Sequence, residues 1–175
     1  MNQYKKKQQG AVLVISLIML VLLTIIGVTS MQVTGLEEKM SGNNKDHNAA
    51  FQAAEVTLRN AELYINSLTT LADFNDTQAG FLSEATDDPN YLSAATWTTA
   101  NSATGRSVDS LSTTPRYIIK HVGEQGDSIN EGLNVTGYGE SLAGGAITLF
   151  RVTAMSTGNT GNSRIIVQSY YGQRF

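Results

Sequence analysis

The chain has 175 residues, a formal net charge of −3 and 15% charged residues, fewer than the ~25% of an average soluble domain. It contains no cysteine, which excludes disulfides, thiolate metal sites and thiol nucleophiles. An acidic chain without a basic stripe is a poor direct binder of nucleic acid, because that binding depends mainly on neutralising phosphate charge.

The chain starts with a short basic leader, residues 1–10, in which Lys5, Lys6 and Lys7 are consecutive. Residues 11–28 follow as 18 positions without a charge. At ~1.5 Å per residue such a helix is about 27 Å long, close to the ~30 Å hydrocarbon core of a bilayer. Polar, uncharged residues then extend the pattern, so we expect a transmembrane helix over residues 11–34.

The three lysines also predict the orientation of this helix, since positive charge beside a first span stays in the cytoplasm. The C-terminal part of a single-pass protein is then extracytoplasmic. A cleaved secretory signal is the main alternative, but its apolar region is shorter and ends in a small-residue cleavage site, which is absent here. A buried soluble helix is the other alternative, and the sequence offers no second apolar run to shelter it.

Residues 35–72 predict an amphipathic continuation of the helix, with a weak point at the Gly/Asn cluster 41–44. Apolar residues then recur at helical spacing and define one face: Ala50, Ala54, Leu58, Ala61, Ile65 and Leu68, broadened by Phe51. We interpret the last part of this face as core. For residues 36–51, contact with other subunits is at least as good an interpretation.

Residues 73–115 are polar and lack periodicity, which indicates an irregular or partly helical insertion in which Trp97 is a packing anchor. Strand patterns follow over residues 117–122, 146–154 and 164–171. The Gly/Asn-rich segment 156–163 predicts that the last two strands form an antiparallel hairpin. We therefore expect an α+β fold, in which a long N-terminal helix packs on a small antiparallel β-sheet within residues 116–171. Residues 73–175 would be the extracytoplasmic globular part.

No arrangement of residues in the sequence indicates an enzyme, a metal site or a cofactor site. His47 and His121 fall in different elements, which favours structural roles. The acidic residues Asp87, Asp88, Asp127 and Glu131 do not follow the EF-hand pattern, so solvated turns are the better interpretation.

Several segments carry a family resemblance. Gln8-Gln9-Gly10-Ala11 precede the apolar run, residues 37–43 read Glu-Glu-Lys-Met-Ser-Gly-Asn, and residues 50–55 read Ala-Phe-Gln-Ala-Ala-Glu. Further matching segments are residues 115–119, 150–154 and 158–163. In these segments the chain resembles the PilX-type minor pilins of the type IV pilus, a branch of the prepilin family. The resemblance is close over residues 8–62 and 115–171 and weak between them.

The resemblance implies a type IV pilin-like fold and processing of the N-terminus. A prepilin peptidase would cleave between Gly10 and Ala11 on the cytoplasmic side, and Ala11 would then be N-methylated. The helix would serve first as a membrane anchor and later as part of the filament core. The residues expected in both roles are Val14, Ile15, Leu17, Leu20 and Leu22.

The resemblance also implies function, place and partners. The chain would be a minor pilin in the initiation or assembly of the pilus. Beyond assembly, the resemblance implies a position at the tip and a role in adhesion or aggregation. It would lie in the inner membrane with a periplasmic C-terminal domain, and then in the cell-surface pilus. Its partners would be inner-membrane lipid, other minor pilins, the major pilin, the pilus assembly platform and, at the tip, an adhesin.

Two departures from the family pattern bear on this interpretation. Major pilins carry Glu at the fifth mature position, where this chain has Ile15. The absence of cysteine means that a disulfide-bounded adhesive loop cannot be carried over. The alternatives left open are a pseudopilin of a type II secretion system and a membrane-anchored receptor or sensor domain.

Overall fold

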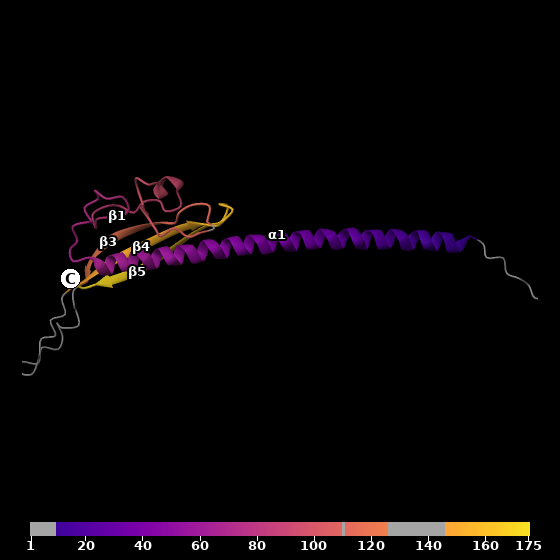
Figure 1. The fold of residues 1–175 in the computed structure, drawn as a ribbon, viewed down its shortest axis with the longest axis horizontal. Helices are drawn as coiled ribbons and strands as arrows, with labels where there is room; N and C mark the ends of the chain where they lie inside the picture. Colours follow the sequence, from indigo (N-terminus) through magenta and orange to yellow (C-terminus); the bar gives the residue numbers. More distant parts are fainter. Residues whose placement is uncertain (1–9, 110, 126–145) are drawn as a thin grey trace, which may run out of the picture. The chain divides into compact units, whose positions relative to one another are not determined.

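The computed structural model describes residues 10–109, 111–125 and 146–175 (Figure 1). Its elements in chain order are α1 (Ala11–Ser67), β1 (Phe81–Leu82), the 3₁₀ helix η1 (Ala94–Trp97), β2 (Ala103–Thr104), β3 (Arg116–Gln125), β4 (Ile147–Thr157) and β5 (Arg164–Gln173). The chain divides into two compact units, residues 1–44 (unit 1) and residues 45–175 (unit 2). The predicted α+β class is confirmed.

Helix α1 continues through the Gly/Asn cluster 41–44 and ends at Ser67. A glycine in a helix costs only about 1 kcal/mol relative to alanine. Extending an existing helix adds one hydrogen bond per residue, so a single weak position does not need to interrupt it. The cluster is therefore not a break, and the helix ends five residues before the predicted limit at residue 72.

In unit 2, one face of α1 forms the core with the sheet. The predicted face is confirmed at Ala50, Ala54, Leu58, Ala61 and Ile65, which are all buried, and Leu68 packs against the same cluster while partly exposed. Phe51 lies outside the core, because its side chain is 45% exposed, and the alternative expected for residues 36–51, contact with other subunits, stays open for it. It follows Ala50 by about 100° around the helix, which is enough to turn it away from the sheet.

The sheet has the strand order β1-β3-β4-β5, with β2 paired to β3 off this path. The predicted β4–β5 hairpin is confirmed, and β3 pairs antiparallel with β4. The insertion 73–115 contributes two strands that the sequence analysis did not predict: β1, which is parallel to β3, and β2, which is antiparallel to it. Each is two residues long, too short to show a period-2 pattern.

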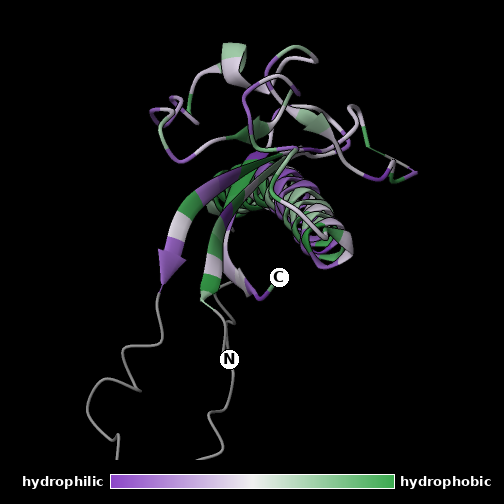
Figure 2. Ribbon diagram, turned by 90° about the vertical axis from the view of Figure 1, so that its left-hand side faces the viewer, coloured by the Kyte–Doolittle hydropathy of each residue, from purple (hydrophilic) through white to green (hydrophobic). Residues whose placement is uncertain are grey.

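The sheet of unit 2 is covered on both faces. Successive side chains of a strand point to opposite faces, and Figure 2 shows hydrophilic and hydrophobic bands alternating along the strands. Phe150, Val152 and Ala154 of β4 face the α1 core. On the opposite face, Arg151 binds Asp88, which belongs to the insertion. The insertion thus forms a second layer over the sheet.

Trp97 lies in that second layer and is buried, with 6% of its surface exposed. Its indole Nε1 donates a hydrogen bond of 2.8 Å to the carbonyl oxygen of Tyr91, and the two rings lie 6.2 Å apart. The prediction of a packing anchor is confirmed. A single tryptophan therefore ties the polar insertion together where regular structure is sparse.

Candidate functional site

The expected processing junction lies where α1 begins. Gly10 has a positive φ of 30° and precedes the helix, whose first residue is Ala11. The Leu13 N–H donates to the Gly10 carbonyl oxygen at 3.1 Å, which closes the first turn. The residue expected to start the mature chain is thus also the first helical residue. Cleavage and methylation at this junction remain predictions.

Over residues 11–28 of unit 1, the helix carries no charge and exposes apolar side chains on every side, whereas Glu37, Glu38 and Lys39 follow further along. Residues expected in the membrane and the filament core lie along it, with 50% to 62% of each side chain exposed: Val14, Ile15, Leu17, Leu20 and Leu22. A helix that is apolar all round belongs either in a protein core or in a membrane. Of the residues described by the structure, only α1 includes a stretch long and apolar enough to cross a bilayer, and that stretch is unburied. This arrangement is compatible with single-pass anchoring.

The hydroxyl groups of this stretch are all satisfied within the helix. Each donates to a carbonyl oxygen three or four residues earlier, at 2.7 to 3.1 Å: Ser16, Thr24, Thr29, Ser30 and Thr34. An unsatisfied hydroxyl in hydrocarbon is costly, because no water is present to replace the missing bond. The serine and threonine residues of this stretch therefore do not oppose its placement in lipid.

At the start of unit 2, α1 is fastened to the β4–β5 turn by an interaction that the sequence analysis did not predict. The Asp46 carboxylate accepts hydrogen bonds from the Thr160 backbone N–H at 2.9 Å and from the Thr160 hydroxyl at 2.8 Å. We call Asp46 and residues 158–163 the Asp46 clasp. Hydrogen bonds from Thr160 and Ser163 lower the pKa of Asp46 from 3.8 to about 2.

Gly158 is needed for the clasp to close. A Cβ atom at this position would lie 2.3 Å from Asp46 Oδ2, far inside contact distance. The Gly158 N–H also donates to the Ser163 carbonyl oxygen at 2.8 Å, which holds the turn shut. The turn was predicted from its Gly and Asn content, but nothing in the local pattern showed that a buried aspartate 112 or more residues earlier would fill it.

The two histidines lie in different surroundings. His47 is exposed on α1, whereas the ring of His121 packs against Phe74 and Phe150 with centroids 6.5 and 5.8 Å away. Across the ranges that the structure describes, no three His, Cys, Asp or Glu side chains gather as a metal site. Asp127 and Glu131 lie outside the described residues.

Asp88 is exposed, as expected of a solvated turn, but it also forms ion pairs that were not expected. Its carboxylate pairs with Lys120 Nζ at 3.2 Å and with Arg151 Nη2, both on the face of the sheet away from α1. Burial raises the pKa of Asp88, but hydrogen bonds from Arg151 and Lys120 outweigh it and leave the pKa below its ordinary value. Asp88 is therefore an anchor of the insertion on the sheet.

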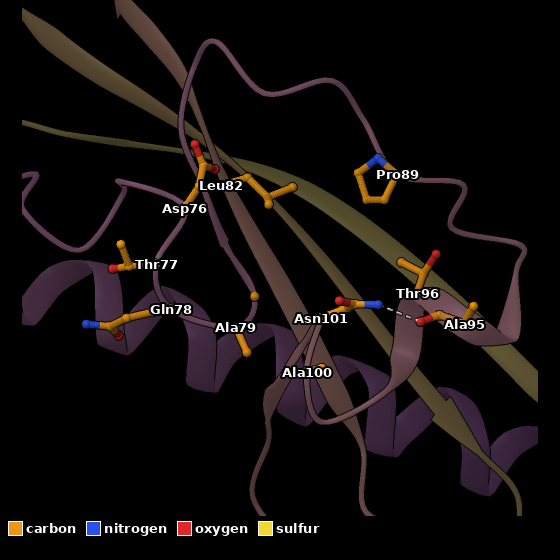
Figure 3. Close-up of a pocket in the computed structure, with 11 residues that line it drawn as sticks. Asp76, Thr77, Gln78, Ala79, Leu82, Pro89, Ala95, Thr96, Ala100 and Asn101 are labelled. Atoms are coloured by element: carbon orange, nitrogen blue, oxygen red, sulfur yellow. Dashed lines mark hydrogen bonds between the residues drawn. The ribbon is translucent and has the colours of Figure 1, made fainter.

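An open pocket of about 330 Å³ lies between the loop before β1 and the segment around η1. Figure 3 shows Thr77 and Gln78 on one side of it and Pro89, Ala95 and Thr96 on the other. The one hydrogen bond drawn among its lining residues joins Asn101 Nδ2 to the Ala95 carbonyl oxygen at 2.9 Å. Small and neutral side chains dominate the lining, which suits packing better than catalysis.

Comparison with known families covers nearly the whole chain. Residues 9–59 match the PilX N-terminal family, and residues 59–173 match the family described as type IV pilus assembly protein PilX C-term. Searches of curated proteins and of solved structures found no match. The second family alone spans more than half of the chain, and the first covers the apolar helix on which the resemblance depends. The chain therefore belongs to the PilX family of type IV pilus assembly proteins and is a PilX-type minor pilin.

Proposed function

We propose that this minor pilin takes part in starting type IV pilus assembly and works at or near the filament tip. The observation that carries the proposal is the exposed apolar surface of α1 over residues 11–28, extended by uncharged residues to position 34 and followed by a separate compact unit 2. Such a helix can exchange lipid contacts for contacts with neighbouring helices. The same surface then serves in the membrane and in the filament.

The proposed orientation places unit 2 in the periplasm. Lys5, Lys6 and Lys7 precede α1 and would be retained in the cytoplasm until cleavage. A prepilin peptidase then cuts between Gly10 and Ala11, and Ala11 is methylated. From the inner membrane the subunit passes into the pilus, where it contacts other minor pilins, the major pilin and the assembly platform.

Ile15 supports a terminal position. In major pilins a Glu at this place is thought to meet the N-terminal amine of the adjacent subunit. A charge without a partner in hydrocarbon costs about 2.5 kcal/mol or more, so Ile15 removes that cost together with the docking contact. A subunit at a filament end has one such contact fewer to make.

The decisive experiment is to determine the N-terminus of the mature protein isolated from its own cells. Methyl-Ala11 as the first residue supports the prepilin pathway, whereas an intact Met1 overturns it. An intact leader on a protein that purifies without pilus components favours the receptor or sensor alternative. Gene neighbourhood and deletion of the gene distinguish a pseudopilin from a minor pilin. Loss of a pseudopilin abolishes secretion and leaves pili in place.

Adhesion and aggregation are tested separately from assembly. A deletion strain is complemented with the chain, and pili are counted before cells are scored for attachment to surfaces and to each other. If the deletion strain has normal pilus numbers but attaches less than the complemented strain, the subunit has a direct role in adhesion. If pilus number and attachment fall together, the subunit acts in assembly alone. An adhesin at the tip would co-purify with the subunit from sheared pili.

A further inference from the structure

The loop between α1 and β1 carries a short motif that the function proposed above does not use: Asp73-Phe74-Asn75-Asp76-Thr77. Asn-x-Thr, with any residue except proline in the middle, is the acceptor sequence of N-glycosylation. Bacterial oligosaccharyltransferases additionally select an acid two residues before the asparagine, the place that Asp73 occupies. The combination is much rarer by chance than Asn-x-Thr alone.

The sequence contains one other Asn-x-Ser/Thr, which serves as an internal comparison. It is Asn134-Val135-Thr136, and it has Gly132 where the first motif has an acid. Asn134 lies outside the described residues. An enzyme that requires the acid should therefore distinguish Asn75 from Asn134 in the same molecule.

The acceptor residues are accessible in unit 2. Asn75, Asp76 and Thr77 are all exposed, whereas Phe74 beside them is buried and packs against Phe81 at 5.8 Å between ring centroids. The Thr77 N–H donates to Asn75 Oδ1 at 3.1 Å, and the Thr77 hydroxyl donates to the same oxygen. Within the described part of the chain, Asn75 Nδ2, the atom to which a glycan is attached, donates no hydrogen bond.

The middle residue of the motif is held away from the acceptor. Asp76 has a positive φ of 61°, and its carboxylate accepts from the Ser83 N–H at 2.9 Å and from the Ser83 hydroxyl at 2.6 Å. Asp76 and Thr77 both line the pocket of Figure 3. Phe74 and Asp76 thus anchor the loop. The side chain of Asn75 between them, and that of Thr77 after them, stay exposed.

We propose that Asn75 is an acceptor for N-linked glycosylation. Asn75 Nδ2 attacks the anomeric carbon of a polyprenyl-pyrophosphate-linked oligosaccharide; the C–N bond forms and the bond from that carbon to the pyrophosphate oxygen breaks. The pyrophosphate leaves with the electron pair, and the amide proton passes to a base of the transferase. This inference rests on the outward orientation proposed for unit 2, because lipid-linked oligosaccharides are used on the non-cytoplasmic face of the membrane.

The test expresses the full chain in a bacterial host together with an oligosaccharyltransferase and undecaprenyl-pyrophosphate-linked oligosaccharide. Mass spectrometry of the purified protein is expected to find one glycan mass on the peptide containing Asn75 and none on the peptide containing Asn134. Asn75→Gln and Thr77→Val should abolish the addition, and Thr77→Ser should retain it.

A matched pair of variants tests the role of the acid. Asp73→Asn should reduce occupancy at least tenfold. Tyr64→Phe removes only the hydroxyl that donates to Asp73 Oδ2 at 2.6 Å, and it should leave occupancy unchanged. Loss of modification in both variants would overturn the selection by the Asp73 carboxylate, because Tyr64→Phe leaves that carboxylate in place. Equal modification of Asn75 and Asn134 would overturn the selection by Asp73.

Failure of the inference is distinguishable from failure of the proposed orientation. Protease added to spheroplasts reports whether unit 2 is outside the cytoplasm, and a known acceptor protein in the same cells reports that the transferase works. An accessible unit 2 with an unmodified Asn75 overturns the glycosylation proposal alone. A protected unit 2 overturns the orientation, and the glycosylation proposal with it.

Discussion

The carboxylate of Asp46 on α1 accepts hydrogen bonds from both the backbone N–H and the hydroxyl of Thr160, 114 residues later in the chain. Toward the other end of the hairpin, the Ser169 hydroxyl donates to Glu62 at 2.9 Å and the Tyr171 hydroxyl donates to Asn66 at 2.7 Å. The hairpin is therefore attached to α1 along its whole length. The Asp46 clasp marks the first point at which the long helix becomes part of a folded unit.

Opening the clasp should destabilise unit 2. Asp46→Asn replaces an acceptor oxygen with an NH₂ group that faces the Thr160 donors, and Gly158→Ala places a methyl group against the carboxylate. We expect each to lower the melting temperature of the detergent-solubilised chain by several degrees in circular dichroism. Asn159→Ala, in the same turn but exposed, is the control and should change it little.

The stability losses caused by Asp46→Ala and Gly158→Ala should not be additive. Asp46→Ala removes the atoms that a Gly158→Ala methyl group would strike, so the double variant should lose less stability than the two single losses added together. Strict additivity would show that the two residues do not contact each other in solution.

Stability should depend on pH through the same carboxylate. The folded pKa of Asp46 is about 2 against an ordinary value of 3.8, so the folded state binds the proton more weakly than the unfolded state. Its contribution is complete above the unfolded pKa and is lost as the pH falls toward the folded pKa. The stability difference between wild type and Asp46→Asn should therefore be constant near neutral pH and shrink between about pH 4 and pH 2. A difference that grows on acidification would contradict the clasp.

The sequence predicted the parts of this protein that have a clear period. The spacing from Ala50 to Ile65 marked the buried face of α1, and the β-branched runs marked β3, β4 and β5. Phe51 was expected to broaden this face, with contact to other subunits as an equally good interpretation, and its 45% exposure leaves it outside the core. An apolar residue beside a helical stripe does not reveal where the packing partner ends. Burial depends on the width of the sheet above it.

Contacts between distant segments could not be predicted, since no local pattern records them. No sequence pattern distinguished Asp46, and Asp88 was interpreted only as part of a solvated turn. Each acquires its role only when the fold brings its donors within hydrogen-bonding distance. The strands β1 and β2 were missed for a related reason, as their hydrogen-bonding partners lie far along the chain in β3.

Two positions close together on α1 differ sharply in burial. Ile65 is fully buried in the core cluster and Leu63 is 67% exposed. Ile65→Ala should cost about 2–5 kcal/mol, since it leaves a cavity that the sheet cannot fill. Leu63→Ala should change the free energy of unfolding by less than about 0.5 kcal/mol. Chemical denaturation of both variants measures the difference, and equal effects would contradict the packing of α1 on the sheet.

The ion pairs of Asp88 should contribute modestly. Its carboxylate is 45% exposed, so solvent screens its attraction to Lys120 and Arg151, and Asp88→Asn is expected to cost about 1 kcal/mol. The loss should be smaller at high salt, where the wild-type interaction is already screened. Asp87→Asn is a matched control, because Asp87 is exposed and its substitution removes the same charge from the same loop. A larger effect at Asp87 would show that net charge, rather than the pairing, matters.

The sharpest test of the proposed terminal position is Ile15→Glu. Ile15 is exposed on the apolar surface of α1, so a glutamate there would be in hydrocarbon before assembly, at a cost of about 2.5–3.5 kcal/mol without a partner. We expect fewer pili per cell, counted by electron microscopy, because the charged subunit would seek the internal contact that major pilins make. Immunogold labelling should find the remaining subunits along the filament. Ile15→Leu keeps the position apolar and should preserve pilus number and placement, while cleavage at Gly10 should continue in both variants. Normal pilus number and tip placement with Ile15→Glu would show that the apolar residue does not determine where this subunit works.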